Sequence, residues 1–149
     1  MKLFSPILIL IVLFSFKTKL NKNEKMLVGV WQCTEVDFSD FVSKLSPEDK
    51  VMFDAMMPMM DEAFKTLKLT FKADGTYISY LNAMGEESEN TGTWKLSEDA
   101  KSINTQLNET EEVLSVVSLT KSEMVLEFDS NGLKTKLKLV KQKPTKSKK

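Results

Sequence analysis

The feature that most constrains this 149-residue chain is a series of short segments in which apolar and polar residues alternate, each followed by turn residues. Alternation with a period of two places one set of side chains on each face of a β-strand. Asp74-Gly75 and Asn131-Gly132 are typical of hairpin turns, because glycine accepts the positive φ that such turns require. The expected strands occupy residues 27–36, 67–72, 76–82, 90–96, 102–107, 112–119, 124–129 and 133–141.

Eight strands joined by short turns predict an all-β fold. Short connections make consecutive strands antiparallel neighbours. Eight such strands close into an up-and-down antiparallel barrel, which removes exposed edges and leaves an interior for side chains or one small ligand. A sandwich of seven or eight strands is the structural alternative, but it usually needs a long crossover. Only the first connection here is long, and a helix fills it, so we expect the barrel.

The long connection between the first two strands has the features of a helix over about residues 46–67. Ser46 is suited to the N-cap and Pro47 to the first helical position, and acidic residues follow in the first turn. Pro58 predicts a kink or a break into two short helices. The apolar stripe expected to face the barrel comprises Val51, Met52, Ala55, Met56, Met59, Met60, Ala63, Phe64 and Leu67.

Methionine is unusually concentrated in this helix, and three roles are open to the side chains. They can pack as the underside of a helix that closes the barrel, since methionine fills irregular gaps, or they can form an adaptable lid over an apolar ligand. Their thioethers could also bind Cu(I), but no Cys or His stands beside them, so we predict no metal and no cofactor. The cluster consists of Met52, Met56, Met57, Met59 and Met60.

The chain has no Arg and no His, and it has one Cys. This composition excludes His-based catalytic triads, His-ligated metals, arginine clamps for phosphate and intrachain disulfides. Cys33 is expected to be a small buried apolar residue, because no His can activate its thiol as a nucleophile. The acidic pairs Glu86-Glu87 and Glu111-Glu112 lie in predicted turns. General acid–base catalysis needs a carboxyl group with a raised pKa in a dry pocket, and exposure to water in a turn opposes this. We therefore expect no enzymatic activity.

The formal net charge of zero conceals a segregation of charge along the chain. Residues 35–129 carry 20 acids against eight Lys, a balance of −12, whereas residues 130–149 carry eight Lys and no acid. A body that is acidic has no basic face for phosphate groups, so nucleic acid is not an expected partner. The Lys-rich end, residues 144–149, is expected to be a disordered tail.

The N-terminal segment, residues 1–25, is expected to be a secretory signal or membrane anchor. Residues 3–16 form an uncharged apolar run, which suits the central region of a signal and is shorter than the roughly 20 residues of a spanning helix. No small-residue pair marks a cleavage site, so cleavage and anchoring both remain open. The sequence predicts export to the periplasm, envelope or exterior, with membrane association through this segment, ahead of one folded domain at residues 26–143.

Several of these segments resemble the lipocalin family. Gly29-Val30-Trp31 is similar to the Gly-x-Trp signature of lipocalins, and the segments 69–77 and 91–96 look like recurring parts of small bacterial lipocalin-like envelope proteins. The resemblance implies a barrel with a helical insertion after the first strand, and a small hydrophobic ligand. Lipocalins usually lay an Arg over the signature Trp. This chain has none, and Lys138 or Lys141 could replace it through a cation–π contact.

Five side chains are the candidate ligand-binding residues, while Gly29 and Trp31 are the structural signature. Trp31 and Trp94 lie on the expected inward faces. Both can fill the closed end of the barrel as core aromatics, or Trp94 can line a cavity and contact the ligand. The candidates are Trp94, Phe71, Tyr77, Met56 and Met60.

Two functions follow from this sequence. The first is a non-enzymatic binding protein that holds a small hydrophobic molecule in the barrel under the Met-rich helix. The second is a structural or protein-interaction module of the same fold with a filled barrel. A binding protein should keep an apolar cavity of at least ~300 Å³, whereas a structural module should not.

Overall fold

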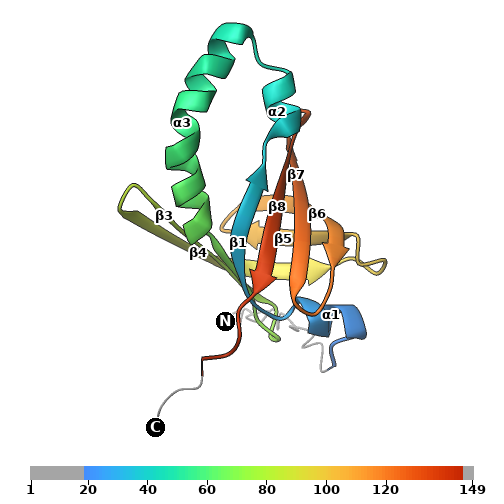
Figure 1. Ribbon diagram of the computed structural model, residues 1–149. Coiled ribbons are helices and arrows are strands. Elements are labelled where there is room, and N and C mark those ends of the chain that lie inside the picture. The colour runs from blue at the N-terminus through green and yellow to red at the C-terminus, as the bar shows by residue number, and fades with distance from the viewer. Residues whose placement is uncertain (1–18, 146–149) are drawn as a thin grey trace, which may run out of the picture.

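The computed structural model describes residues 19–145, which form three helices and eight strands (Figure 1). The helices are α1 (Lys22–Leu27), α2 (Ser39–Ser43) and α3 (Pro47–Thr66). The strands are β1 (Gly29–Asp37), β2 (Lys68–Phe71), β3 (Thr76–Ala83), β4 (Glu86–Leu96), β5 (Ser102–Leu107), β6 (Thr110–Leu119), β7 (Glu123–Ser130) and β8 (Leu133–Lys141).

The strands form a closed antiparallel barrel in sequential order, and β8 pairs with β1 to close it. This confirms the expected fold class. The expected strand boundaries hold to within two residues except in β4, which begins at Glu86 instead of Asn90. Met84 and Gly85 both have positive φ, and this tight turn keeps Ala83 paired with Glu86. The hairpin therefore continues through acidic residues that alternate too weakly to indicate a strand.

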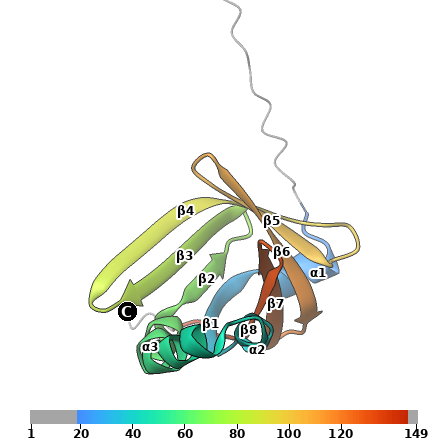
Figure 2. The same cartoon turned by 90° about the horizontal axis from the view of Figure 1, so that it is seen from above.

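Helix α3 begins as the sequence predicts and then differs in two respects. The Ser46 hydroxyl caps it by accepting from the Asp49 N–H. The expected break at Pro58 is absent, because the helix continues through this residue. Pro58 is exposed, so water can satisfy the carbonyl that its missing N–H leaves free. The helix runs beside β1 and contacts β1 and β3 (Figures 1 and 2).

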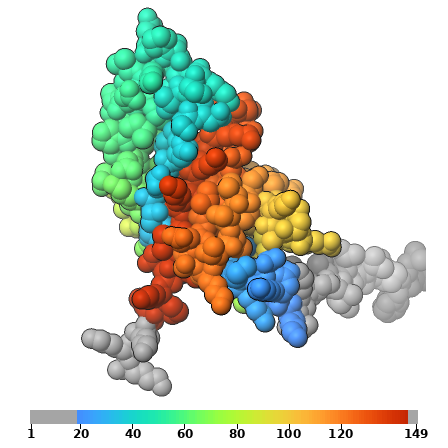
Figure 3. All heavy atoms as spheres, turned by 45° about the vertical axis from the view of Figure 1, so that its right-hand side comes forward, coloured from blue at the N-terminus to red at the C-terminus, as the bar shows by residue number. Residues whose placement is uncertain are grey.

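The expected apolar stripe of α3 is displaced around the helix. Val51, Met52, Met56 and Met59 are all more than half exposed, and no residue of α3 is fully buried. Met60, Ala63 and Phe64 of the expected stripe are half-buried, and Phe53 and Met57, which lay outside it, are half-buried as well. Phe53, Met57, Met60 and Phe64 are spaced by four, three and four positions. The α2–α3 insertion (residues 39–66) projects beyond the barrel (Figure 3), so only part of its circumference meets other elements.

One end of the barrel is closed by Trp31 beneath α1. The Trp31 indole is fully buried, and its Nε1–H donates to the Leu27 carbonyl oxygen (2.7 Å). The Lys141 ammonium lies 4.9 Å from the centre of the indole ring and donates to the carbonyl oxygens of Met26 (2.6 Å) and Val28 (2.8 Å). Lys141 thus takes the place expected for it, whereas Lys138 pairs with a carboxylate of β1.

Gly29 allows Lys141 to reach this position. Its φ of 144° is rarely adopted by other residues, and a Cβ built on it would lie 3.0 Å from Cε of Lys141. A side chain at position 29 would therefore displace the lysine that covers Trp31. This explains the Gly-x-Trp spacing in physical terms.

Helix α1 crosses the expected boundary at residue 25. Asn21 caps it through a reciprocal pair of hydrogen bonds with Glu24, and Glu24 and Leu27 are buried. Residues 22–25 therefore belong to the folded body. Residues 1–18 of the expected signal or anchor lie outside the described residues, as do residues 146–149 of the expected tail, while Pro144 and Thr145 have no regular secondary structure.

The barrel interior near the closed end is filled by aromatic side chains. The rings of Phe71 and Tyr77 lie 5.2 Å apart, and Trp94 meets Phe71 edge-on at 5.9 Å. The Trp94 Nε1–H donates to the Lys72 carbonyl oxygen (2.9 Å). All three are buried, as is Cys33.

Within residues 19–145, no helix is long and apolar enough to cross a bilayer.

Replacing Trp31 by Ala should destabilise the protein by about 3–5 kcal/mol, the usual cost of truncating a buried aromatic side chain. Urea denaturation measures the loss. Val30→Ala is the matched control, because the neighbouring Val30 side chain is 37% exposed and should cost less than about 1 kcal/mol. Equal losses in the two variants would contradict the closure of the barrel by Trp31.

Tyr77 should make the fold sensitive to alkali. Burial, assisted by the charge of Glu112, raises the pKa of Tyr77 to about 12 from its ordinary value of 10.0. Because the folded-state pKa is the higher one, the stabilisation is complete below pH 10 and is lost as the pH rises towards 12. The loss is about 1.4 kcal/mol per pH unit.

Urea unfolding of the native protein and of Tyr77→Phe at pH 9.5 and 11.5 tests this dependence. The native protein should lose more stability between the two values than the variant, which has no hydroxyl to ionise. Parallel losses would show that the Tyr77 hydroxyl is accessible to water.

Candidate ligand-binding site

An apolar pocket lies at the end of the barrel opposite Trp31, under the α2–α3 insertion. We call it the mouth pocket. It has a volume of about 210 Å³, and three phenylalanines make up much of its wall. Its lining residues are Phe38, Phe41, Phe53, Met60, Ser130, Leu133 and Thr135.

The phenylalanines are brought together by the change of direction after β1. Phe38 follows the last residue of β1, and Phe41 lies three positions later on α2. Phe53 reaches them from α3, with ring centres 5.6 Å from Phe38 and 5.2 Å from Phe41. Phe64 packs edge-on against Phe38 at 5.6 Å. Such aromatic contacts fix the insertion over the barrel end, although no residue of α3 is fully buried.

The opposite wall comes from the hairpin between β7 and β8. Asn131 and Gly132 both have positive φ, and Ser130 pairs with Leu133 across the turn. This tight turn places Ser130, Leu133 and Thr135 on the pocket. Their two hydroxyl groups are the polar side-chain atoms among the lining residues, so the pocket can offer hydrogen bonds at one wall and apolar contact elsewhere.

Charged groups beside the mouth pocket stay ionised. Hydrogen bonds from the side chain and backbone of Ser39 lower the pKa of the Asp37 carboxyl. The Asp40 carboxyl accepts from the Lys134 backbone N–H (3.0 Å) and the Lys44 ammonium (2.9 Å), which lowers its pKa as well. Carboxyl groups held in this way are poor proton donors at neutral pH. The cluster is suited to stabilising the hairpin and α2 rather than to acid catalysis.

The structure divides the predicted site residues into two groups. Phe71, Tyr77 and Trp94 come together, but as the buried packing of the closed half, and none of them lines the mouth pocket. Met60 lines the mouth pocket. Met56 does not, and its side chain is 53% exposed.

Sequence reasoning missed every lining residue of the mouth pocket except Met60, namely Phe38, Phe41, Phe53, Ser130, Leu133 and Thr135. A signal for one of them, Phe53, was present. Phe53, Met57, Met60 and Phe64 recur at helical spacing and include the helix's aromatic residues, which bury more apolar area than methionine. Because methionine and valine occupy other faces of the same helix, the apolar pattern alone indicates two stripes.

The volume of the mouth pocket limits what it can hold. Sites for drug-sized ligands usually exceed about 300 Å³, whereas an apolar cavity of about 150 Å³ suffices for benzene. A pocket of 210 Å³ is smaller than the ~300 Å³ that we expected of a binding protein, so it suits only one ring or a short alkyl chain.

The described residues offer no metal-binding group of three or more Asp, Glu, Cys or His side chains. Burial raises the pKa of the Cys33 thiol, which keeps it protonated. Cys33 therefore lacks the thiolate that a nucleophile needs.

Comparison with solved structures gives matches of low identity. The extracellular fatty acid binding protein As-p18 matches at 10% identity, with a TM-score of 0.44, over 79% of this chain and 97% of its own. Bovine odorant-binding protein with a selenium-containing odorant matches at 18% identity, with a TM-score of 0.44, over 85% and 76%. The same bovine protein with undecanal gives 18%, 0.43, 86% and 77%.

A search of curated proteins gives no significant match. The comparison with family models is decisive, because the model of the lipocalin-like domain matches residues 27–126, which is more than half of the chain. The matched segment includes the Gly29–Trp31 signature and the α2–α3 insertion. The chain belongs to the lipocalin-like domain family.

Proposed function

We propose that this protein is a non-enzymatic binding protein that takes a small hydrophobic ligand into the mouth pocket. The observation that carries the proposal is the position of this apolar pocket, under the α2–α3 insertion and at the end of the barrel that Trp31 does not close. The family to which the chain belongs consists generally of binding proteins. In this proposal the ligand lies under the Met-rich helix and contacts Met60 but not Met56.

The residues that line the mouth pocket suit a flexible apolar ligand. Met60 is unbranched and repacks easily, and α3 has no fully buried residue that would anchor it rigidly. A volume of 210 Å³ accommodates about seven carbons of an alkyl chain, at roughly 30 Å³ per water-sized group. The eight-carbon alcohol n-octanol can therefore bury most of its chain there with its hydroxyl end at the opening. Burying these carbons gains about 0.8 kcal/mol each, which corresponds to a Kd somewhat below 1 mM.

The filled closed half of the barrel favours a second candidate function. Trp31, Phe71, Tyr77 and Trp94 occupy this region as tightly packed core. A barrel in which such packing extends to the mouth would be a structural or protein-interaction module without a ligand. The two functions differ in whether the mouth pocket takes up an apolar molecule.

Binding of n-octanol should be weakened at least about fivefold by Met60→Gln, because the new amide must lose its water when the pocket fills. Met56→Gln is the matched control and should leave binding within about twofold, since Met56 is half exposed and does not line the pocket. Amide NMR resonances of Ser130 and Leu133 report octanol binding in both variants and in the native protein.

Two outcomes of this titration would contradict the ligand-binding function. The first is that saturating octanol leaves the Ser130 and Leu133 resonances of the native protein unchanged. The second is that both substitutions weaken binding equally. Unfolding in urea, measured on the same samples, shows whether either variant has lost its fold.

We also propose that the protein acts outside the cytoplasm. The support is the apolar run at residues 3–16, which has the length of a signal's central region. Residues 1–25 fused to a reporter that is active only after export, such as alkaline phosphatase, should give activity. Replacing Leu10 and Leu13 by Lys should abolish it, because charge in this run opposes entry into the export channel. Equal activity of both fusions would contradict export through this segment.

A further inference from the structure

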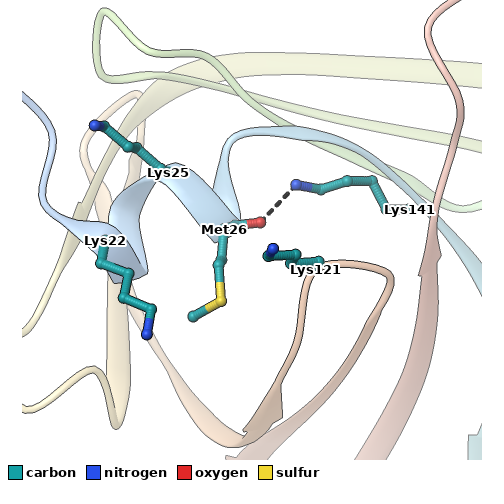
Figure 4. A pocket seen from close by; sticks show the side chains of 5 residues that line it. All are labelled: Lys22, Lys25, Met26, Lys121 and Lys141. Carbon is teal, nitrogen blue, oxygen red and sulfur yellow. Dashed lines mark hydrogen bonds between the residues drawn. The ribbon is translucent and has the colours of Figure 1, made fainter.

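A second pocket lies at the closed end of the barrel, and four lysines dominate its wall. We call it the basic pocket. It has a volume of about 480 Å³ and is lined by Lys22, Lys25, Met26, Lys121 and Lys141. Figure 4 shows the four lysine side chains arranged around Met26. The lysines come from α1, from the turn between β6 and β7, and from the end of β8.

The lysines of the basic pocket have no acidic partners among residues 19–145. No carboxylate lies within ion-pair distance of Lys22, Lys25, Lys121 or Lys141 in this part of the chain. The exposed Glu123 follows Lys121 by two positions and does not line the pocket.

Two lysines near the mouth form ion pairs instead. Lys44 pairs with Asp40 at 2.9 Å, and Lys134 pairs with Glu127 at 3.2 Å. At the closed end, Lys22, Lys25 and Lys121 line one pocket without ion pairs and can meet an external anion, whereas the Lys141 ammonium also donates to the Met26 and Val28 carbonyls.

The rest of the folded body is acidic, in contrast to the closed end. Residues 35–129 have a balance of −12, so most of the barrel and the insertion repel an anionic surface. Helix α1 begins and β8 ends at this closed end (Figure 1), so the sequence segments before α1 and after β8 attach to the body there. The apolar run at residues 3–16 precedes α1 in the sequence, and four further lysines follow Lys141.

We propose that the basic pocket is a docking surface for an anionic phospholipid bilayer. Four to eight lysines beside an apolar segment are the recognised pattern for such a surface, and each strengthens binding about fivefold. The hydrocarbon stems of the lysines and the Met26 side chain can lie against the interface while the ammonium groups reach the phosphates. Docking through the closed end leaves the mouth pocket facing away from the membrane.

This inference does not depend on ligand binding at the mouth. The two sites lie at opposite ends of the barrel and share no lining residue. Loss of octanol binding and loss of membrane docking are therefore separate results.

Sedimentation of the full-length chain with lipid vesicles tests the proposal. The quantity measured is the ratio of the partition coefficient on vesicles of 70% phosphatidylcholine and 30% phosphatidylserine to that on pure phosphatidylcholine. This ratio cancels the contribution of the apolar run, which does not depend on lipid charge. The variant is Lys22→Gln, Lys25→Gln and Lys121→Gln together, and it spares Lys141 because that side chain also stabilises the barrel end.

The matched control is Lys44→Gln, Lys50→Gln and Lys65→Gln, which changes the net charge equally on the α2–α3 insertion. The native protein should favour the anionic vesicles strongly, and 0.5 M NaCl should remove the preference. The basic-pocket variant should lower the ratio about a hundredfold, and the control variant should change it by less than about twofold.

Three results would overturn the proposal. One is a native ratio close to one, and another is an equal fall in both variants, which would indicate a response to net charge alone. The third is competition by inorganic phosphate at constant ionic strength, which would make the basic pocket a site for a free anion. Circular dichroism of each variant establishes that the barrel has folded.

Discussion

The closure of one barrel end by Trp31 is the interaction on which the rest of the structure depends. The indole is held between the Leu27 carbonyl and the Lys141 ammonium, and Lys141 in turn ties the end of β8 to the residues around α1. This arrangement joins the first and last elements of the barrel, whose strands β1 and β8 pair directly. Because the closed half is packed with Trp31 and the Phe71–Tyr77–Trp94 cluster, free space for an apolar ligand is left at the other end.

The insertion between β1 and β2 supplies the aromatic side chains at that other end. Phe38, Phe41 and Phe53 bring aromatic rings over the mouth, yet α3 contributes no fully buried residue. A helix with few buried contacts opens at lower cost than a barrel strand, whose backbone is paired on both sides. The fold thus separates a deeply buried closed end, which carries lysines without ion pairs, from a mouth whose helical cover α3 has no fully buried residue.

Strand order and the turn positions could be predicted from the sequence, because alternation and Asp-Gly or Asn-Gly pairs act locally. A lysine covering Trp31 was also expected, with Lys138 and Lys141 as the two candidates, and Lys141 takes this position. The orientation of α3 was not, since Val51, Met52, Met56 and Met59 are as apolar as the residues that pack inward. Tertiary contact with α2 selected the aromatic stripe. Trp94, Phe71 and Tyr77 were correctly placed in the interior, but periodicity cannot distinguish a side chain that fills a barrel from one that lines a cavity.

Xenon binding in crystals of the protein locates the apolar space of the barrel. Xenon enters dry apolar cavities of this size without needing a hydrogen bond. The account predicts an anomalous xenon peak in the mouth pocket, between Phe53 and Met60. A peak among Phe71, Tyr77 and Trp94 would contradict it, because the closed half would then contain the ligand space. The same conclusion would follow if xenon bound nowhere under the α2–α3 insertion.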